Sequence, residues 1–278
     1  MNTLSDVRAS LVASGLRELH PVFTDTATAA LQSLEFCLAT MTRRERERDT
    51  GCGADGTPTF HLDRIVEEAI VDATAQHGVN VLSEEVGFID RASSLTLVVD
   101  PVDGSANAAA DVPLSCFSAA LALDDQFISA ATVWLETGRT WAASADGKRR
   151  SQSHWATTGH TTLTGAAVSL LRPHARNRDA WWRVTERASR IRILSSTCLE
   201  AMLVLQGSTD AFADAGSDTH RLVDLIAAAV LLPLAGGVVV DLYDRPIVLD
   251  VDLTKRWSGI VAATPQLADE IVAAILGN

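Results

Sequence analysis

The chain has 278 residues, 47% of them hydrophobic, and a formal net charge of −12. A chain of this length can bury a substantial core in one large or two medium domains. The acidic balance argues against a nucleic-acid-binding protein, which needs a basic face. It does not prevent the binding of a sugar phosphate, because bound metal ions supply local positive charge.

Cysteine usage and hydropathy point to a cytoplasmic protein. Cys37, Cys52, Cys116 and Cys198 are scattered without metal-ligand spacing, which indicates reduced thiols. The first residues have no signal-type apolar core. The longest apolar run, 225–240, is shorter than the roughly 20 residues of a membrane span and contains a proline and two glycines.

The periodicity of apolar residues predicts helices over 1–48 and near 61–77, and then a series of strands and helices. Strands are expected at 79–83, 95–99, 115–123, 127–135, 139–143, 166–171, 191–194, 210–214, 237–241 and 259–263, and helices at 178–189, 197–206, 221–234 and 265–276. The second half alternates between the two kinds of element, which indicates a sheet covered by helices.

Two halves of one compact unit are therefore expected. Residues 1–160 form an α+β half with most of the candidate metal ligands. Residues 161–278 form an α/β half that carries Asp224 and the substrate contacts.

The segment 97–107, Leu-Val-Val-Asp-Pro-Val-Asp-Gly-Ser-Ala-Asn, is the most informative part of the chain. Its apolar run predicts a buried strand, and the proline and glycine predict a turn that presents Asp100, Asp103 and Ser105 on a loop. Two carboxylates this close repel one another unless a cation separates them, and oxygen ligands suit Mg²⁺ or Mn²⁺. The glycine–serine backbone suits a phosphate. The alternative is that both aspartates are ordinary turn formers.

Three further acidic positions accompany this segment. Asp63 lies near the first turn of the helix at 61–77, and Glu84 follows the strand at 79–83. Asp224 interrupts an apolar helix, where it has no local partner and is costly to bury, which indicates a metal ligand at a helix start. The alternatives are that Asp63 complements the helix dipole and that Asp224 is an N-cap or faces solvent.

In order and spacing, these elements resemble the inositol monophosphatase superfamily. The matching motifs are Thr-x-x-x-Asp at 59–63, Glu-Glu after a strand, Asp-Pro-Val-Asp-Gly-Ser at 100–105, and an Asp in an Ala-rich helix before Ala-Gly-Gly at 235–237. The runs at 55–59 and 83–89 are most similar to the archaeal branch, which acts on inositol monophosphate and fructose 1,6-bisphosphate. The resemblance implies a layered αβαβα sandwich of the inositol monophosphatase/fructose-1,6-bisphosphatase type.

The resemblance also implies two or three Mg²⁺ ions in each site, with Mn²⁺ as an alternative. Glu84, Asp100 and the carbonyl oxygen of Val102 are expected to hold one ion. Asp100, Asp103 and Asp224 are expected to hold a second, about 3.5–4 Å from the first. Ser105 stands where the family usually has Thr, and this departure removes no metal ligand.

The expected reaction is direct attack by a metal-activated water, without a phosphoenzyme. Ser105, with Asp63 or Glu84, is expected to orient this water and accept its proton. The backbone N–H groups of Gly104 and Ser105 are expected to hold the phosphate oxygens. A third, weaker ion is implied near Asp63 and Glu84.

Substrate contacts are assigned by resemblance to five residues: Asp103, Ser195, Ser196, Thr197 and Asp214. The alternatives are a helix N-cap at 195–197 and a strand-end turn at Asp214. A bisphosphate needs a second cation, and Arg172 is the first candidate because its guanidinium matches a phosphate.

The sequence thus predicts a phosphatase for a small phosphate ester, without a nucleic-acid or membrane partner, and the family implies a homodimer. Alternatives are histidinol phosphate or 3′-phosphoadenosine 5′-phosphate as substrate, or a catalytically silent regulatory relative. Aspartyl-phosphate phosphatases need Asp-x-Asp, whereas two residues separate Asp100 from Asp103.

Overall fold

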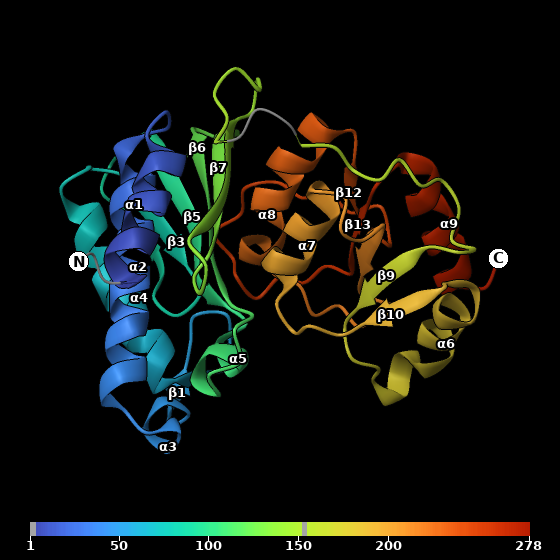
Figure 1. Ribbon diagram of the computed structural model, residues 1–278, viewed down its shortest axis with the longest axis horizontal. Coiled ribbons are helices and arrows are strands. Elements are labelled where there is room, and N and C mark those ends of the chain that lie inside the picture. The colour runs from blue at the N-terminus through green and yellow to red at the C-terminus, as the bar shows by residue number, and fades with distance from the viewer. Residues whose placement is uncertain (1–3, 152–154) are drawn as a thin grey trace.

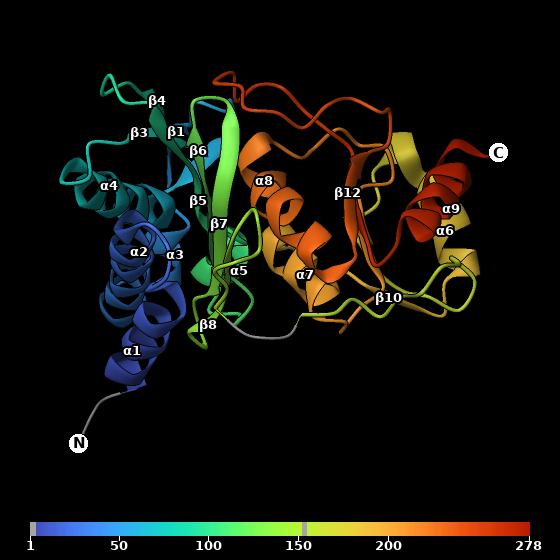
Figure 2. The same cartoon turned by 90° about the horizontal axis from the view of Figure 1, so that it is seen from above.

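Two large β-sheets, a small two-stranded sheet and three layers of helices build the described part of the molecule (Figure 1). The structure, a computed structural model, describes residues 4–151 and 155–278. The layers follow one another in the order helix, sheet, helix, sheet, helix, as Figure 2 shows from above. The predicted αβαβα sandwich is confirmed.

The first sheet contains six strands in the order β4-β3-β5-β6-β7-β8. These are β3 (Asn80–Ser83), β4 (Gly87–Ile89), β5 (Leu95–Asp103), β6 (Cys116–Leu123), β7 (Gln126–Trp134) and β8 (Arg139–Ser144). β3 and β5 are parallel, and the other neighbouring pairs are antiparallel. The outer face is covered by α1 (Leu4–Leu16), α2 (Pro21–Thr40) and α4 (His61–Ala75).

The second sheet contains five strands in the order β10-β9-β11-β13-β12. These are β9 (Ala167–Leu170), β10 (Arg190–Arg192), β11 (Ala211–Ala213), β12 (Val238–Asp241) and β13 (Gly259–Ala262). Two helices, α7 (Thr197–Leu205) and α8 (Leu222–Leu231), lie between the two sheets, and α6 (Arg178–Arg187) and α9 (Pro265–Leu276) cover the far face.

The alternation of side chains along β5 determines where its acidic end points. Leu97 and Val99 pack in the core beneath α1, α2 and α4, whereas Val98 packs in the core formed with α7 and α8. Because successive side chains of a strand point to opposite faces, Asp100 faces the same side as Val98. The strand therefore delivers this carboxylate to the helical layer between the sheets.

The region predicted to be helical at the start of the chain contains α1, α2 and the short α3 (Arg43–Arg46). The break before α2 has a local cause: Pro21 is the first residue of α2, and Nδ1 of His20 accepts a hydrogen bond from the N–H of Val22 at 3.2 Å. None of the described helices is long and apolar enough to cross a membrane.

Most other predicted elements are present within a few residues of their predicted ends. The predicted helix at 221–234 ends as an α-helix at Leu231 and continues as a 3-10 turn at Leu232–Ala235; another such turn spans Ala175–Asn177. Four short elements were not predicted: β1 (Asp49–Cys52), β2 (Pro58–Phe60), β4 and α5 (Ser105–Ala109). Elements this short carry too few residues to show a periodicity.

Candidate active site

Asp100 and Asp103 lie in a bulge near the end of β5, and the prediction that they lie on a loop after the strand was wrong. Asp100 is paired with Ser118 and Asp103 with Cys116, so three steps along β5 match two along β6. The proline between the aspartates has no N–H to donate to β6, which favours such an irregularity. Val102, the predicted carbonyl ligand, lies in the bulge, and its N–H donates to Asp100 Oδ1 at 3.1 Å.

The first turn of α7 holds Asp103. The N–H groups of Thr197 and Cys198 donate to its carboxylate at 3.1 and 2.9 Å, and the hydroxyl of Ser196 also donates to it. The start of a helix carries partial positive charge, which stabilises a carboxylate there. Burial nevertheless raises the pKa of Asp103 to about 6, against the effect of the Ser196 hydroxyl.

Asp100 offers a buried oxygen atom that lacks a donor. The residue is 1% exposed, and Oδ2 has no hydrogen-bond partner among the described residues. Burial, followed by the negative charges of Glu84, Asp103 and Asp224, raises the pKa of Asp100 well above its usual value. A divalent cation would stabilise such an oxygen, so the carboxylates present fit the implied Mg²⁺.

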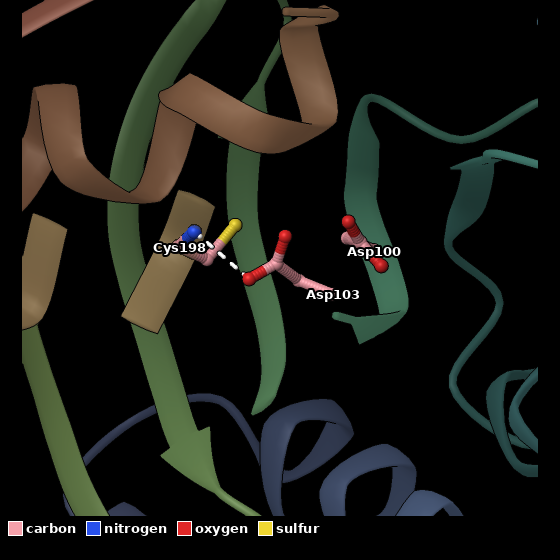
Figure 3. A group of neighbouring side chains, drawn as sticks. All are labelled: Asp100, Asp103 and Cys198. Atoms are coloured by element: carbon pink, nitrogen blue, oxygen red, sulfur yellow. Dashed lines mark hydrogen bonds between the residues drawn. The ribbon is translucent and has the colours of Figure 1, made fainter. Parts of the chain in front are cut away.

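Cys198 brings a sulfur atom to the same place (Figure 3). A carboxylate oxygen of Asp100, one of Asp103 and Sγ of Cys198 all lie within 4.8 Å of one another. The thiol donates to the carbonyl oxygen of Asp224 at 3.3 Å. A hydrogen bond with Cys116 and burial raise the pKa of Cys198 well above its usual value. A thiol that keeps its proton is a poor ligand for a hard cation, so the oxygen atoms define the site.

Glu67 of α4 holds the turn that presents Glu84. Its Oε1 accepts hydrogen bonds from the hydroxyl of Ser83 at 2.5 Å, the N–H of Glu85 at 3.0 Å and the N–H of Val86 at 3.1 Å. Three donors on one carboxylate oxygen fix the backbone after β3. Glu84 is thereby directed toward the layer that contains α8.

Arg221 connects the remaining carboxylates. Its Nη2 and Nε contact Oδ1 and Oδ2 of Asp224 at 2.9 and 3.1 Å, and its Nη1 contacts Asp55 Oδ2 at 2.8 Å and Glu84 Oε1. The expectation that Asp224 has no local partner was therefore wrong. Against the effect of burial, Arg221 lowers the pKa of Asp224. Burial raises the pKa of Glu84 to about 8, although Arg221 opposes this shift.

Sequence reasoning missed both Arg221 and Asp55. The available signal for Arg221 was its position three residues before Asp224 at a helix start, where the two side chains can meet. Asp55 belongs to the motif at 55–59 but received no role of its own. Its buried carboxylate accepts hydrogen bonds from the N–H and hydroxyl of Thr57 at 2.8 and 2.9 Å.

Asp63 lies in the first turn of α4, as predicted, and close to Ser105. Its Oδ2 accepts a hydrogen bond from the N–H of Phe60 at 3.1 Å. Burial, followed by the charge of Glu85, raises the pKa of Asp63 to about 7, and the Ser105 hydroxyl opposes the shift. The Ser105 hydroxyl therefore lies near the Asp63 carboxylate, whose Oδ1 has no hydrogen-bond partner among the described residues.

Gly104 permits the sharp start of α5. Its φ is +81°, and a Cβ on this residue would lie 2.7 Å from the carbonyl oxygen of Leu114. A side chain is excluded here by both the conformation and the close approach. Ser105 is the first residue of α5, so its N–H has no acceptor within the helix and is available to an anion.

A pocket of about 280 Å³ opens beside Asp103. It is lined by Asp103, Leu171, Arg172, His174, Ile193, Ser195, Thr197 and Thr219. Four predicted substrate contacts are thus brought together: Asp103, Arg172, Ser195 and Thr197. A larger cavity of about 830 Å³ lies between the start of α2, the start of β7 and the end of β8, and no candidate site residue lines it.

Ser196 and Asp214, also predicted as substrate contacts, do not line this pocket. Ser196 is buried, and its hydroxyl is directed to Asp103. Asp214 is fully buried and accepts hydrogen bonds from the N–H and hydroxyl of Ser217 at 2.8 and 2.6 Å. The carboxylate of Asp214 therefore braces a turn at the end of β11, which was the alternative interpretation.

The layered fold and the cluster of buried carboxylates are those of a phosphoric monoester hydrolase. The chain belongs to the inositol monophosphatase family, whose family model matches residues 17–277. Family membership confirms the class of enzyme that the motifs predict. The metal dependence general to this family agrees with the acidic cluster.

The relatives include archaeal enzymes. A fructose-1,6-bisphosphatase/inositol-1-monophosphatase of Thermococcus kodakarensis is 26% identical over 234 residues, 82% of this chain and 86% of that protein. A bifunctional NADP phosphatase/NAD kinase of Methanococcus maripaludis is 28% identical over 255 residues, 81% of this chain and 44% of that protein. A crystal structure of an inositol monophosphatase–fructose 1,6-bisphosphatase has a TM-score of 0.79 at 23% identity, over 91% of this chain and 98% of that one, and shares its fold.

Proposed function

We propose that the protein is a Mg²⁺-dependent phosphatase for a sugar or polyol phosphate, namely inositol monophosphate, fructose 1,6-bisphosphate or both. The observation that carries this proposal is the position of Asp103, which belongs to the carboxylate cluster and also lines the 280 Å³ pocket. A small substrate in the pocket would therefore have its ester next to the cluster. The name of the relative from Thermococcus kodakarensis supports the same two substrates.

Four carboxylates and one carbonyl oxygen would hold the ions: Glu84, Asp100, Asp103, Asp224 and the carbonyl of Val102. When bound, Mg²⁺ supplies positive charge that offsets the charge of the phosphate and lowers the pKa of a water molecule. The chain itself offers few free cationic groups here, because the guanidinium of Arg221 is engaged by carboxylates.

The proton of the attacking water passes to a carboxylate in this proposal. Asp63 suits this role because its pKa of about 7 lies near a neutral working pH. The hydroxyl of Ser105, beside Asp63, would orient the water. The N–H of Ser105, at the start of α5, would donate to a phosphate oxygen.

The size of the pocket bears on the substrate. A volume of about 280 Å³ lies near the lower limit of small-molecule sites, about 300–1,000 Å³, and suits one sugar or polyol ring. Arg172 and His174 line the pocket and could meet a second phosphate. A second candidate is the phosphate of NADP, favoured by the relative from Methanococcus maripaludis. Histidinol phosphate and 3′-phosphoadenosine 5′-phosphate stay alternatives.

Phosphate release from each candidate ester, with Mg²⁺ and with EDTA, tests the proposal. We expect turnover of inositol 1-phosphate or fructose 1,6-bisphosphate that EDTA abolishes. Preferred turnover of NADP or of another ester would replace the substrate but keep the class. The absence of metal-dependent turnover on every ester would contradict the proposal and favour a catalytically silent relative.

Arg172→Gln is expected to change the choice between substrates. Loss of a charged hydrogen bond costs about 1.5–3 kcal/mol, so the ratio of kcat/KM for fructose 1,6-bisphosphate to that for inositol 1-phosphate should fall by roughly 10- to 100-fold. Arg176→Gln, at an exposed position outside the pocket lining, is the matched control. An unchanged ratio in Arg172→Gln would show that the second phosphate binds elsewhere.

A further inference from the structure

Arg221 is an internal cation inside a cluster that is expected to bind metal ions. Its side chain is only 16% exposed and contacts three carboxylates, those of Asp55, Glu84 and Asp224. Two of these three are predicted metal ligands. An arginine in this position holds the same oxygen atoms that a divalent cation would need.

The predicted ligands differ in how free they are. Oδ2 of Asp100 has no donor among the described residues. Both oxygens of Asp224, in contrast, contact the guanidinium, and Oδ2 also accepts the N–H of Arg221 at 2.6 Å. Glu84 is bound by the same guanidinium. No hydrogen bond has to break before Oδ2 of Asp100 binds a cation, whereas the oxygens of Glu84 and Asp224 that Arg221 contacts become available only after Arg221 releases them.

Arg221 cannot release these carboxylates by losing its proton. The guanidinium is always charged in proteins, and Asp224 and Glu84 raise its pKa further against the effect of burial. Its displacement must therefore be a movement of the charged side chain. Asp55 offers an anchor for it: this carboxylate is not a predicted metal ligand, and it already contacts Nη1 at 2.8 Å.

We propose that Arg221 is the counter-ion of Glu84 and Asp224 in the metal-free protein, and that metal ions compete with it for these two carboxylates. Arg221 retains its pairing with Asp55 when Glu84 and Asp224 bind a cation. The residue thereby stabilises the metal-free fold and weakens the binding of the last metal ion. This inference rests on the proposed metal dependence and assigns Arg221 the control of metal affinity.

Titration of the EDTA-treated, metal-depleted protein with Mn²⁺, followed by the spectroscopic signal of free Mn²⁺, tests the inference without substrate. We expect Arg221→Met to tighten the weakest class of bound Mn²⁺ by roughly 10-fold or more, because the competing cation is gone. In EDTA, the same variant should melt at a lower temperature than the wild type. Addition of Mn²⁺ should raise its melting temperature by more than it raises that of the wild type. Removing one partner of a buried ion pair is strongly destabilising.

Two further variants separate competition from other effects. Arg256→Met also removes a positive charge beside Asp55, but within the described part of the chain Arg256 forms no ion pair with Glu84 or Asp224. We expect it to change the weakest class by less than about threefold. An equal tightening in Arg256→Met would overturn the inference, because net charge alone would then explain the effect. If Arg221→Met does not fold, Arg221→Lys takes its place in the test. Lysine keeps the charge but cannot contact both oxygens of Asp224. We therefore expect Arg221→Lys to bind the weakest class of Mn²⁺ more tightly than the wild type, by less than the 10-fold expected of Arg221→Met.

The other outcomes are also decisive. Unchanged or weaker Mn²⁺ binding in a folded Arg221 variant would overturn the inference, since Arg221 would then position the ligands and not compete for them. In that case the proposed function would stand. A wild-type protein that binds no Mn²⁺ would overturn the proposed metal dependence together with this inference.

Discussion

Asp100→Asn is expected to lower kcat for the preferred phosphate ester by about 10³-fold or more, which corresponds to roughly 4 kcal/mol of transition-state stabilisation. Burial, followed by the negative charges of Glu84, Asp103 and Asp224, raises the pKa of Asp100, so its carboxylate lies among the other predicted ligands. An amide keeps the volume of the side chain but removes the negative charge that two predicted ions would share. Both the number of bound Mn²⁺ ions and the rate of phosphate release should fall.

The matched control for this change is Asp124→Asn. Asp124 is exposed in the turn that follows β6, whereas Cys116 is the first residue of that strand, at its other end. The φ of Asp124 is +51°, a conformation that Asn also adopts readily. We expect its activity to stay within about twofold of the wild type. Full activity in Asp100→Asn, with the fold intact by circular dichroism, would remove Asp100 from the reaction and contradict the proposed site.

The second large effect concerns pH. In EDTA, the free energy of unfolding is expected to decrease as pH rises from about 4 to about 8. Burial raises the pKa of Asp63 and of Glu200 to about 7 and that of Glu84 to about 8. The folded protein thus keeps protons that the unfolded chain has already released at its ordinary pKa values. The contribution is fully present at low pH and is lost as pH rises through the folded-state values.

The contribution of one residue, Asp63, indicates how large the change in the free energy of unfolding is. A rise in the pKa of Asp63 from 3.8 to about 7 corresponds to about 4 kcal/mol. Urea unfolding midpoints at several pH values measure the sum over all groups. The lowered pKa of Asp224 acts with the opposite sign, but below pH 4 and so outside this window.

Mg²⁺ is expected to change this dependence, because a metal binds carboxylates in their deprotonated form. The difference in stability between Mg²⁺ and EDTA should therefore widen as pH rises. Glu200→Gln is the control: Glu200 accepts the N–H groups of Leu194 and Ser196 and is not a predicted ligand. This variant should reduce the pH slope equally in Mg²⁺ and in EDTA. A stability in EDTA that does not vary with pH would contradict the buried, protonated carboxylates.

Much of the fold was predictable because both sheets are buried on both faces. Strands such as β6 are almost wholly apolar and bounded by polar turns, so their limits stand out in the sequence. The bulge in β5 was not predictable in the same way. A proline after an aspartate indicates the end of a strand, and only the pairing of Asp103 with Cys116 shows that the ladder continues.

The residues of the candidate site also divide into those that the sequence could predict and those that it could not. Asp100 and Asp103 carry a motif whose spacing is local, and the structure brings their carboxylates together. Arg221 could not be assigned from spacing alone, because its contact with Asp55 joins residues 166 positions apart in the chain. A basic residue beside a predicted metal ligand also looks unremarkable in a sequence, since only the fold determines whether it points inward or to solvent.

The lining of the 280 Å³ pocket has a consequence for how this enzyme could change its substrate. Of the described residues that line it, Asp103 alone comes from the first half of the chain, and the others come from segments between Leu171 and Thr219. Most of the charged groups proposed for hydrolysis lie in the first half instead. Exchange of short segments in the second half could therefore redirect substrate choice while the hydrolytic groups stay intact. Such a separation of tasks makes new specificities accessible in few evolutionary steps.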